Sequence, residues 1–169
     1  MDKFKTISPS QYCSVFDDIG KDWMLITAGN KDKTNAMTAS WGGLGVMWGK
    51  NVAYIVVRPQ RFTKTLIDTQ STFSLCWLGQ EHRKTLGYMG KASGYKEDKI
   101  ATSGLTVVHH TDGTPYFAQA TKVLVCTKLF AQPYTADSFV DKSILSQWYP
   151  DHDLHTLYIG NIDTVLTKV

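Results

Sequence analysis

Hydrophobic and polar residues alternate in short runs along most of the chain, and glycine, asparagine, aspartate and proline separate these runs. Runs of β-branched and aromatic residues bounded by turn-forming residues are typical of β-strands, so the pattern predicts a β-dominated domain. The first two strands flank the polar segment 29–33, and we expect them to pair as an antiparallel hairpin. The predicted strands are Trp23–Ala28, Asn35–Ser40, Val52–Arg58, Phe73–Leu78, Gly104–His109, Lys122–Phe130 and His155–Leu166.

Two segments depart from this alternation. In the segment Thr63–Thr69, Thr63 and Ile67 are four positions apart, and Phe62 and Leu66 show the same spacing. This spacing predicts a short amphipathic helix with Thr63 as its N-cap. Leu86 and Met89 are three positions apart among charged residues and predict a second helix over Glu81–Met89. Helices this short need packing against a sheet. The sequence therefore indicates an antiparallel barrel or sandwich with short peripheral helices.

The composition fits one globular domain, which we expect to span residues 1–169. The hydrophobic fraction is 43% and the charged fraction 20%, unlike the composition of a disordered chain. No apolar run approaches the roughly 20 residues of a membrane-spanning helix, and the N-terminal residues do not resemble a signal peptide, so we expect a cytoplasmic protein. A net charge of +3 is too small to indicate nucleic-acid binding.

The cysteines and the C-terminal histidines give no sign of a metal or disulfide framework. Cys13, Cys76 and Cys126 are odd in number and widely spaced, and we expect free thiols. The last two lie in predicted strands, where small core side chains are the favoured interpretation. His152 and His155 stand near aspartates, but their spacing matches no zinc pattern, so no metal site is expected.

A glycine-rich segment follows the second predicted strand. Gly42 and Gly43 predict a turn that exposes backbone N–H groups and lets the main chain approach a planar ligand. The glycines do not form a dinucleotide-binding fingerprint, because Trp48 stands where a third glycine is needed and the next stretch is strand-like. Any nicotinamide nucleotide would therefore bind without a dinucleotide-binding domain.

Two arginines lie between a predicted strand and a predicted helix. Arg58 ends the strand, and Arg61 precedes Thr63 at the helix start. Helix N-termini and arginines both favour phosphate oxygens, so the segment has the features of a phosphate site. A solvated basic strand end followed by an ordinary helix cap explains the same residues equally well.

Several blocks taken together resemble the FMN-binding flavin reductase-like family, which includes flavin reductases and flavoredoxin. The similarity runs from about Trp23 to Ile162, with the blocks in the same order. It implies an α+β, Greek-key type antiparallel split β-barrel that forms a homodimer with one FMN per subunit near the interface. The matching blocks are Asn35-x-Met37-Thr38-x-Ser40-Trp41-Gly42, Trp48-x-Lys50, Val57-Arg58-Pro59-x-Arg61-Phe62-Thr63, Gly90–Gly94 with Lys99, and His155–Gly160.

The resemblance also implies residue roles. The strand and turn over 35–42 would flank the isoalloxazine ring, the two arginines and the helix start would surround the phosphate, and the loop near 93–99 would add contacts. Phe62 stands where tyrosine is common in the family, and Tyr95-Lys96 replaces a basic-acidic pair. The expected cofactor-binding residues are Asn35, Ala36, Met37, Thr38, Ser40, Trp41, Gly42, Arg58, Pro59, Arg61, Phe62, Thr63, Ser93, Gly94 and Lys99.

His155 is the candidate catalytic residue. It precedes Leu157 and Ile159 with a period of two, so it should share their face at the edge of the strand. A structural histidine and a flavin or substrate contact remain equal alternatives there. Among the tryptophans, we expect functional roles for Trp41 and Trp48, which lie in glycine-rich surroundings.

The resemblance implies an FMN-dependent oxidoreductase that takes hydride from NADH or NADPH and reduces a free flavin or another acceptor. The cofactor would perform the chemistry, while the protein would hold and orient it. A flavoredoxin-like electron carrier with protein partners and little NAD(P)H activity would have the same fold and cofactor. A ligand-binding β-barrel without flavin is a third alternative. The sequence does not separate these functions.

Overall fold

A computed structural model describes residues 4–7 and 15–168, and its main element is an eight-stranded antiparallel sheet. The strands of this sheet are β1 (Phe4–Ile7), β2 (Met24–Gly29), β3 (Thr34–Ala39), β4 (Gly42–Met47), β5 (Lys50–Val57), β6 (Thr72–Trp77), β9 (Lys122–Pro133) and β10 (Thr156–Lys168). Their order is β3-β2-β6-β9-β10-β5-β4, and β1 pairs with β10. Because β3 and β4 lie at the two ends of this order, the sheet does not close into a complete barrel. β7 (Val107–His109) and β8 (Pro115–Phe117) form a separate pair.

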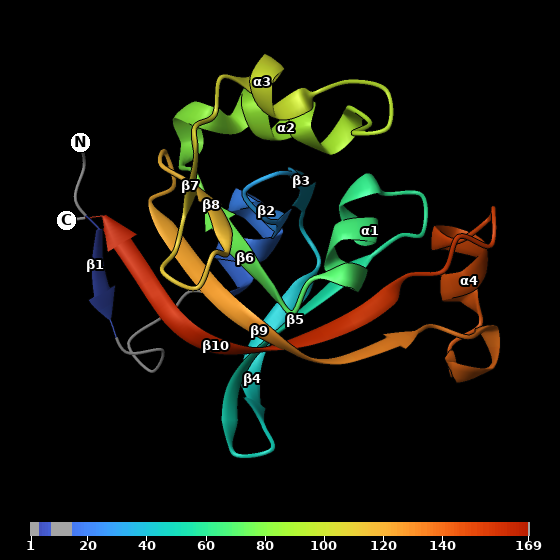
Figure 1. Ribbon diagram of the computed structural model, residues 1–169. Helices are drawn as coiled ribbons and strands as arrows, with labels where there is room; N and C mark the ends of the chain where they lie inside the picture. Colours follow the sequence, from blue (N-terminus) through green and yellow to red (C-terminus); the bar gives the residue numbers. More distant parts are fainter. Residues whose placement is uncertain (1–3, 8–14, 169) are drawn as a thin grey trace.

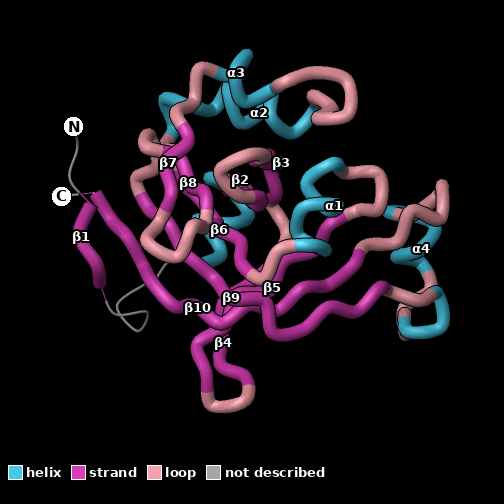
Figure 2. Tube along the Cα trace, viewed as in Figure 1, coloured by secondary structure: helices cyan, strands magenta, loops and turns pink. Residues whose placement is uncertain are grey.

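Short helices surround the curved sheet, as Figures 1 and 2 show. α1 and α2 pack against β2 and β3, and their apolar side chains enter the core. α4 lies at the opposite end of the long β9 and β10 strands from the chain termini (Figure 1). The helices are α1 (Phe62–Thr69), α2 (Arg83–Lys91), α3 (Lys99–Ser103) and α4 (Ser143–Trp148), with single turns at Asp17–Asp22, Gln80–His82 and Ala136–Ser138.

The core has two apolar clusters, one on each face of β2. Met24 and Ile26 belong to the cluster inside the curved sheet, together with Phe73. Leu25 points to the other face, where Leu86 and other side chains form the second cluster. Successive strand residues point to opposite faces, so a strand covered on both faces is apolar throughout. This explains why every residue of β2 is buried.

The predicted fold class is confirmed, and so are the first hairpin and both helices. β2 pairs with β3 in antiparallel register across the turn 30–33, and α1 and α2 lie where the sequence predicts helices. The predicted N-cap at Thr63 is wrong: α1 begins at Phe62, and Arg61 occupies the cap without a side-chain hydrogen bond. The Thr63 hydroxyl instead accepts a hydrogen bond from the Asn35 amide.

Two further sequence predictions need correction. Gly42 and Gly43 do not form a turn but begin β4, which pairs with β5. The missing side chains leave room for Tyr54 across the pair, since a Cβ at Gly45 would lie 2.0 Å from the Tyr54 hydroxyl. The strand predicted from Gly104 is shorter because α3 precedes it and Gly104 is the left-handed C-cap of that helix, with φ of 71°.

The buried cysteines agree with the prediction of free thiols. Cys76 and Cys126 are free and buried, whereas Cys13 lies outside the described residues.

Within residues 4–7 and 15–168, no helix is long and apolar enough to cross a membrane. The same residues contain no group of three or more side chains placed to hold a metal ion.

Candidate functional site

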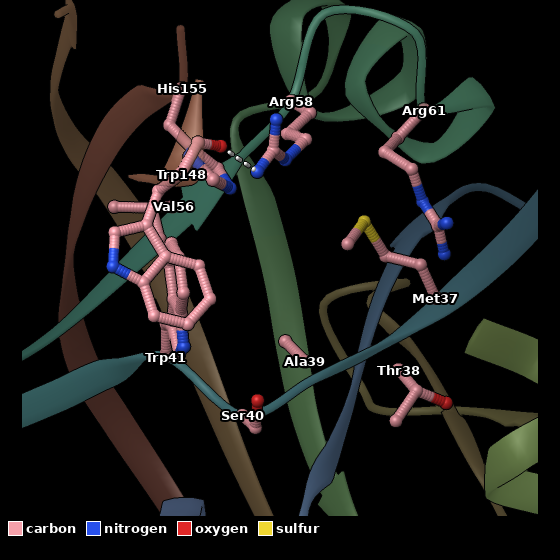
Figure 3. Close-up of a pocket in the computed structure, with 10 residues that line it drawn as sticks. All are labelled: Met37, Thr38, Ala39, Ser40, Trp41, Val56, Arg58, Arg61, Trp148 and His155. Carbon is pink, nitrogen blue, oxygen red and sulfur yellow. Dashed lines mark hydrogen bonds between the residues drawn. The ribbon is translucent and has the colours of Figure 1, made fainter. Parts of the chain in front are cut away.

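A cleft of about 240 Å³ opens beside the ends of β3 and β5. β3 and the short connection after it supply one edge, and the residues between β5 and α1 supply another. The connection from β9 to β10 closes the third side, where α4 ends and β10 is about to begin. Figure 3 shows the residues that line this cleft: Met37, Thr38, Ala39, Ser40, Trp41, Val56, Arg58, Arg61, Trp148 and His155.

Aromatic rings form one wall of the cleft. The Trp41 and Trp148 rings meet edge to face with their centroids 5.1 Å apart, and the Trp41 and His155 rings lie 5.4 Å apart. Figure 3 shows these rings together on one side, with Met37 and Arg61 on the other. Indole rings offer broad apolar surface at small entropic cost, so this wall suits a planar ligand.

Arg61 lines the cleft, and its guanidinium carries a buried donor without a partner. Its Nη1 donates to the Gly90 carbonyl at 2.7 Å, but its buried Nη2 has no hydrogen-bond partner. Burial lowers the pKa of Arg61, which reflects the cost of holding this charge away from water. A buried cationic donor without a partner is costly, so the position is suited to an anion.

Lys99 adds a second buried cation close to Arg61. Its Nζ donates to the carbonyls of Met89 at 3.0 Å and Ala92 at 3.3 Å. Burial, and then the Arg61 charge, lower the pKa of Lys99 to about 8. In the described part of the chain neither cation forms an ion pair. Glu97 acts on Lys99 in the opposite direction, raising its pKa, without forming an ion pair. Two neighbouring cations without an ion-paired carboxylate favour a ligand with negative charge.

Arg58 is already engaged by the protein. It donates from Nη1 to the Asp153 carboxylate and from Nη2 to the Trp148 carbonyl at 2.8 Å. Gln60 also donates to Asp153, at 2.6 Å. These bonds tie the end of β5 to the connection that carries the aromatic wall. Arg58 therefore orients the wall, and Arg61 has the free donor.

A hydrogen bond joins β3 to α1 behind the cleft. The Asn35 amide donates to the Thr63 hydroxyl at 2.8 Å, and both residues are buried. Gly94 approaches the same point, since a Cβ there would lie 2.7 Å from Phe62 Cδ1 and 3.0 Å from the Asn35 Oδ1. The loop after α2 can come this close only because position 94 lacks a side chain.

The structure gathers many of the predicted site residues at the cleft, although not all of them line it. Others support it from behind, and a few lie elsewhere: Ala36 is in the core, Gly42 begins β4, and Pro59 lies in a turn. The lining residues from the predicted set are Met37, Thr38, Ser40, Trp41, Arg58, Arg61 and His155. The supporting or neighbouring residues are Asn35, Phe62, Thr63, Ser93, Gly94 and Lys99.

The tryptophans that line the cleft differ from the sequence expectation. Trp48 lies at the tip of the β4–β5 hairpin, 58% exposed and 6.2 Å from the Phe130 ring, and does not line the cleft. Trp148 lines it instead, together with Ala39 and Val56, which the sequence reasoning also missed. The adjacent aromatic residues Trp148 and Tyr149, shortly before His155, are the signal that could have indicated Trp148.

Comparison with known families identifies the class of protein. Residues 16–168 match the family model described as "Flavin reductase like domain", so the chain belongs to this family. The predicted resemblance is thereby confirmed. Among curated proteins, none matches the chain.

Solved structures of similar fold include an FMN-binding domain of a flavin reductases-like enzyme from Shewanella baltica OS155. It has a TM-score of 0.73 and 13% identity, covering 99% of this chain and 78% of that one. Flavoredoxin of Desulfovibrio vulgaris (Miyazaki F) has a TM-score of 0.67 and 20% identity, covering 86% and 69%. The NADH:FAD oxidoreductase of Streptomyces globisporus C-1027 has a TM-score of 0.64 and 19% identity, covering 88% and 74%. At these identities the similarity establishes the split-barrel fold.

Proposed function

We propose that this protein is an FMN-dependent oxidoreductase that takes hydride from NADH or NADPH and reduces a free flavin or another acceptor. The observation that carries the proposal is the unpaired, buried Nη2 of Arg61, a residue that lines the aromatic-walled cleft. FMN combines a planar ring with a terminal phosphate, and the cleft offers a partner for each. Membership of the flavin reductase like domain family supports the same cofactor.

The residues present fit FMN at both ends. Arg61 and the neighbouring Lys99 would hold the phosphate, where charge-assisted hydrogen bonds are strongest. Met37 and the connection formed by Ser40 and Trp41 would hold the ring against the end of β3. When bound, FMN supplies the hydride-accepting and electron-donating chemistry. The protein binds and orients the ring and leaves one face open to other molecules.

His155 would meet the cleft as a neutral group. Burial, followed by the charge of Arg58, lowers the pKa of His155 to about 4, while Asp153 acts in the opposite direction. The imidazole is therefore uncharged at neutral pH and acts through hydrogen bonding. Its catalytic role in the proposal is to contact the flavin or the hydride donor, without supplying positive charge.

The visible spectrum of the purified protein, followed by NAD(P)H oxidation, tests the function. Flavin absorbance bands, release of FMN on denaturation and steady oxidation of NADH or NADPH with added flavin are the expected results. A yellow protein that oxidises neither nucleotide would indicate an electron carrier and overturn the reductase assignment. Purified protein that neither contains nor binds flavin would overturn both.

We expect the nicotinamide and the acceptor to use the same flavin face in turn. The sequence lacks a dinucleotide-binding unit, and the cleft is small, so the donor must lie over the ring itself. Initial rates over a grid of NAD(P)H and acceptor concentrations should then give parallel double-reciprocal lines. Intersecting lines, with FMN retained throughout, would reveal a ternary complex and contradict the shared face.

The protein is also proposed to be a homodimer. The edge strand β4 and its hairpin expose apolar side chains, with Val46 72% and Trp48 58% exposed, and such patches often mark subunit contacts. Light scattering at micromolar concentration should give about twice the chain mass of 18.9 kDa. Trp48→Glu should shift the protein toward monomer. A wild-type mass of one chain would exclude the dimer.

A further inference from the structure

Within residues 4–7 and 15–168, the His155 ring has one hydrogen-bond partner, a tyrosine outside the cleft lining. The Tyr149 hydroxyl lies 2.8 Å from His155 Nδ1, and the residues are 4% and 7% exposed. Tyr149 directly follows α4, and its ring also meets the His155 ring at 5.4 Å. The pair thus couples the end of α4 to the candidate catalytic imidazole.

The surroundings decide which atom of this pair donates. Among the described residues the Tyr149 hydroxyl has no second hydrogen-bond partner. If Nδ1 carried the proton and donated it, the phenol proton would remain without an acceptor in a buried position, which is costly. If Tyr149 donates, both groups are satisfied. The geometry therefore favours Nδ1 as the acceptor.

The other ring nitrogen meets the cleft. His155 Nε2 has no described protein partner, yet it is not among the buried unpaired atoms, and His155 lines the cleft beside Trp41. In a neutral imidazole one nitrogen donates and the other accepts. When Nδ1 accepts from Tyr149, the proton must sit on Nε2 and be available to a ligand.

We propose that Tyr149 is a positioning residue that holds His155 in the Nε2–H tautomer, so that the imidazole offers a hydrogen-bond donor to the cleft. The matching ligand group is a carbonyl oxygen or ring nitrogen of the bound flavin or of the hydride donor. This assignment of the ligand group rests on the proposed function. The tautomer itself does not, because it follows from contacts within the protein.

The charged and titratable groups around His155 come from several elements. Arg58 follows β5, Asp153 and Tyr149 belong to the connection before β10, and Tyr134 follows β9, with its ring 6.4 Å from His155. Arg58 disfavours a positive imidazole and Asp153 favours it. The Tyr149 hydrogen bond stabilises the neutral ring, so its loss should raise the pKa of His155.

Nitrogen-15 NMR of histidine-labelled protein without flavin tests this inference. Long-range proton–nitrogen correlations at neutral pH should show the Nε2–H tautomer for His155, assigned by the signals lost in His155→Gln. In Tyr149→Phe the signals should shift toward a mixture of tautomers, and the pKa of His155 should rise. Tyr134→Phe is the matched control, because the Tyr134 hydroxyl has no described hydrogen bond, and it should leave both unchanged.

The possible results separate the inference from the proposed function. An Nδ1–H tautomer in the wild type, or an unchanged tautomer and pKa in Tyr149→Phe, would overturn the role of Tyr149 whether or not the protein binds FMN. The Nε2–H tautomer with the expected shift in Tyr149→Phe would support it even in a protein that binds no flavin. Failure of FMN binding would reject the proposed function alone.

Discussion

Replacing Arg61 with methionine should weaken FMN binding by about one to two orders of magnitude, because a charged hydrogen bond contributes roughly 1.5–3 kcal/mol. Methionine keeps much of the side-chain volume and removes the unpaired Nη2 donor. Riboflavin lacks the phosphate, so its binding should change little. Calorimetric titration of both ligands into the apo protein measures the difference between the two effects.

Arg58→Met is the matched control for this experiment. The Arg58 guanidinium already binds Asp153 and the Trp148 carbonyl, so its loss should disturb the aromatic wall. We expect Arg58→Met to weaken the binding of FMN and of riboflavin to a similar extent. If Arg58→Met weakened FMN binding but not riboflavin binding, and Arg61→Met left the FMN affinity unchanged, Arg58 would be the phosphate ligand in place of Arg61.

Gly42→Ala should be the most damaging small substitution near the cleft. Gly42 has φ of 149°, and a Cβ there would lie 2.5 Å from the Tyr54 backbone oxygen. Strained backbone and overpacking each cost on the order of 1–3 kcal/mol, so we expect a loss of about 3 kcal/mol in the free energy of unfolding. For a domain of this size that lowers Tm by roughly 6–12 °C.

Gly49→Ala provides the comparison. Gly49 also has positive φ, at 69°, but a Cβ there would meet nothing within 4 Å. Its replacement should cost only about 1 kcal/mol, from backbone conformation alone. Thermal unfolding of the two variants isolates the steric contribution at Gly42. Equal losses would mean that β4 can move away from Tyr54, and that the position of the adjacent Trp41 is not fixed by this contact.

The site was predictable to the extent that its residues are close in sequence. The family resemblance assigned the segment 35–42 to the cofactor, and Met37, Ser40 and Trp41 do line the cleft. The distinction between the arginines could not be predicted. Arg58 is paired with a residue 95 positions away, and no local pattern reports such a contact.

The structure places Trp148 in the cleft where the sequence predicted Trp48, and the reason is again a long-range contact. Trp48 lies between Gly45 and Gly49 in the sequence, which suggested a functional role, but the β4–β5 hairpin places it away from the cleft and next to Phe130. Trp148 enters the cleft because Arg58 holds the connection before β10 in place. Hairpin direction and long-range ion pairs decide which indole meets the ligand.

The sequence by itself determined most strands of the main sheet, though not β1 or β4, together with the two main helices and the family. Alternation of apolar residues and local motifs depend on neighbours along the chain. Tertiary structure decided the chemistry of individual groups. It leaves Arg61 Nη2 buried without a partner. It also makes the Thr63 hydroxyl the acceptor of a hydrogen bond from Asn35, and it places the Tyr149 hydroxyl at hydrogen-bond distance from His155. The burial and the hydrogen-bond partners of a side chain depend on segments distant in sequence. They control its charge state, its tautomer and its contact with a ligand.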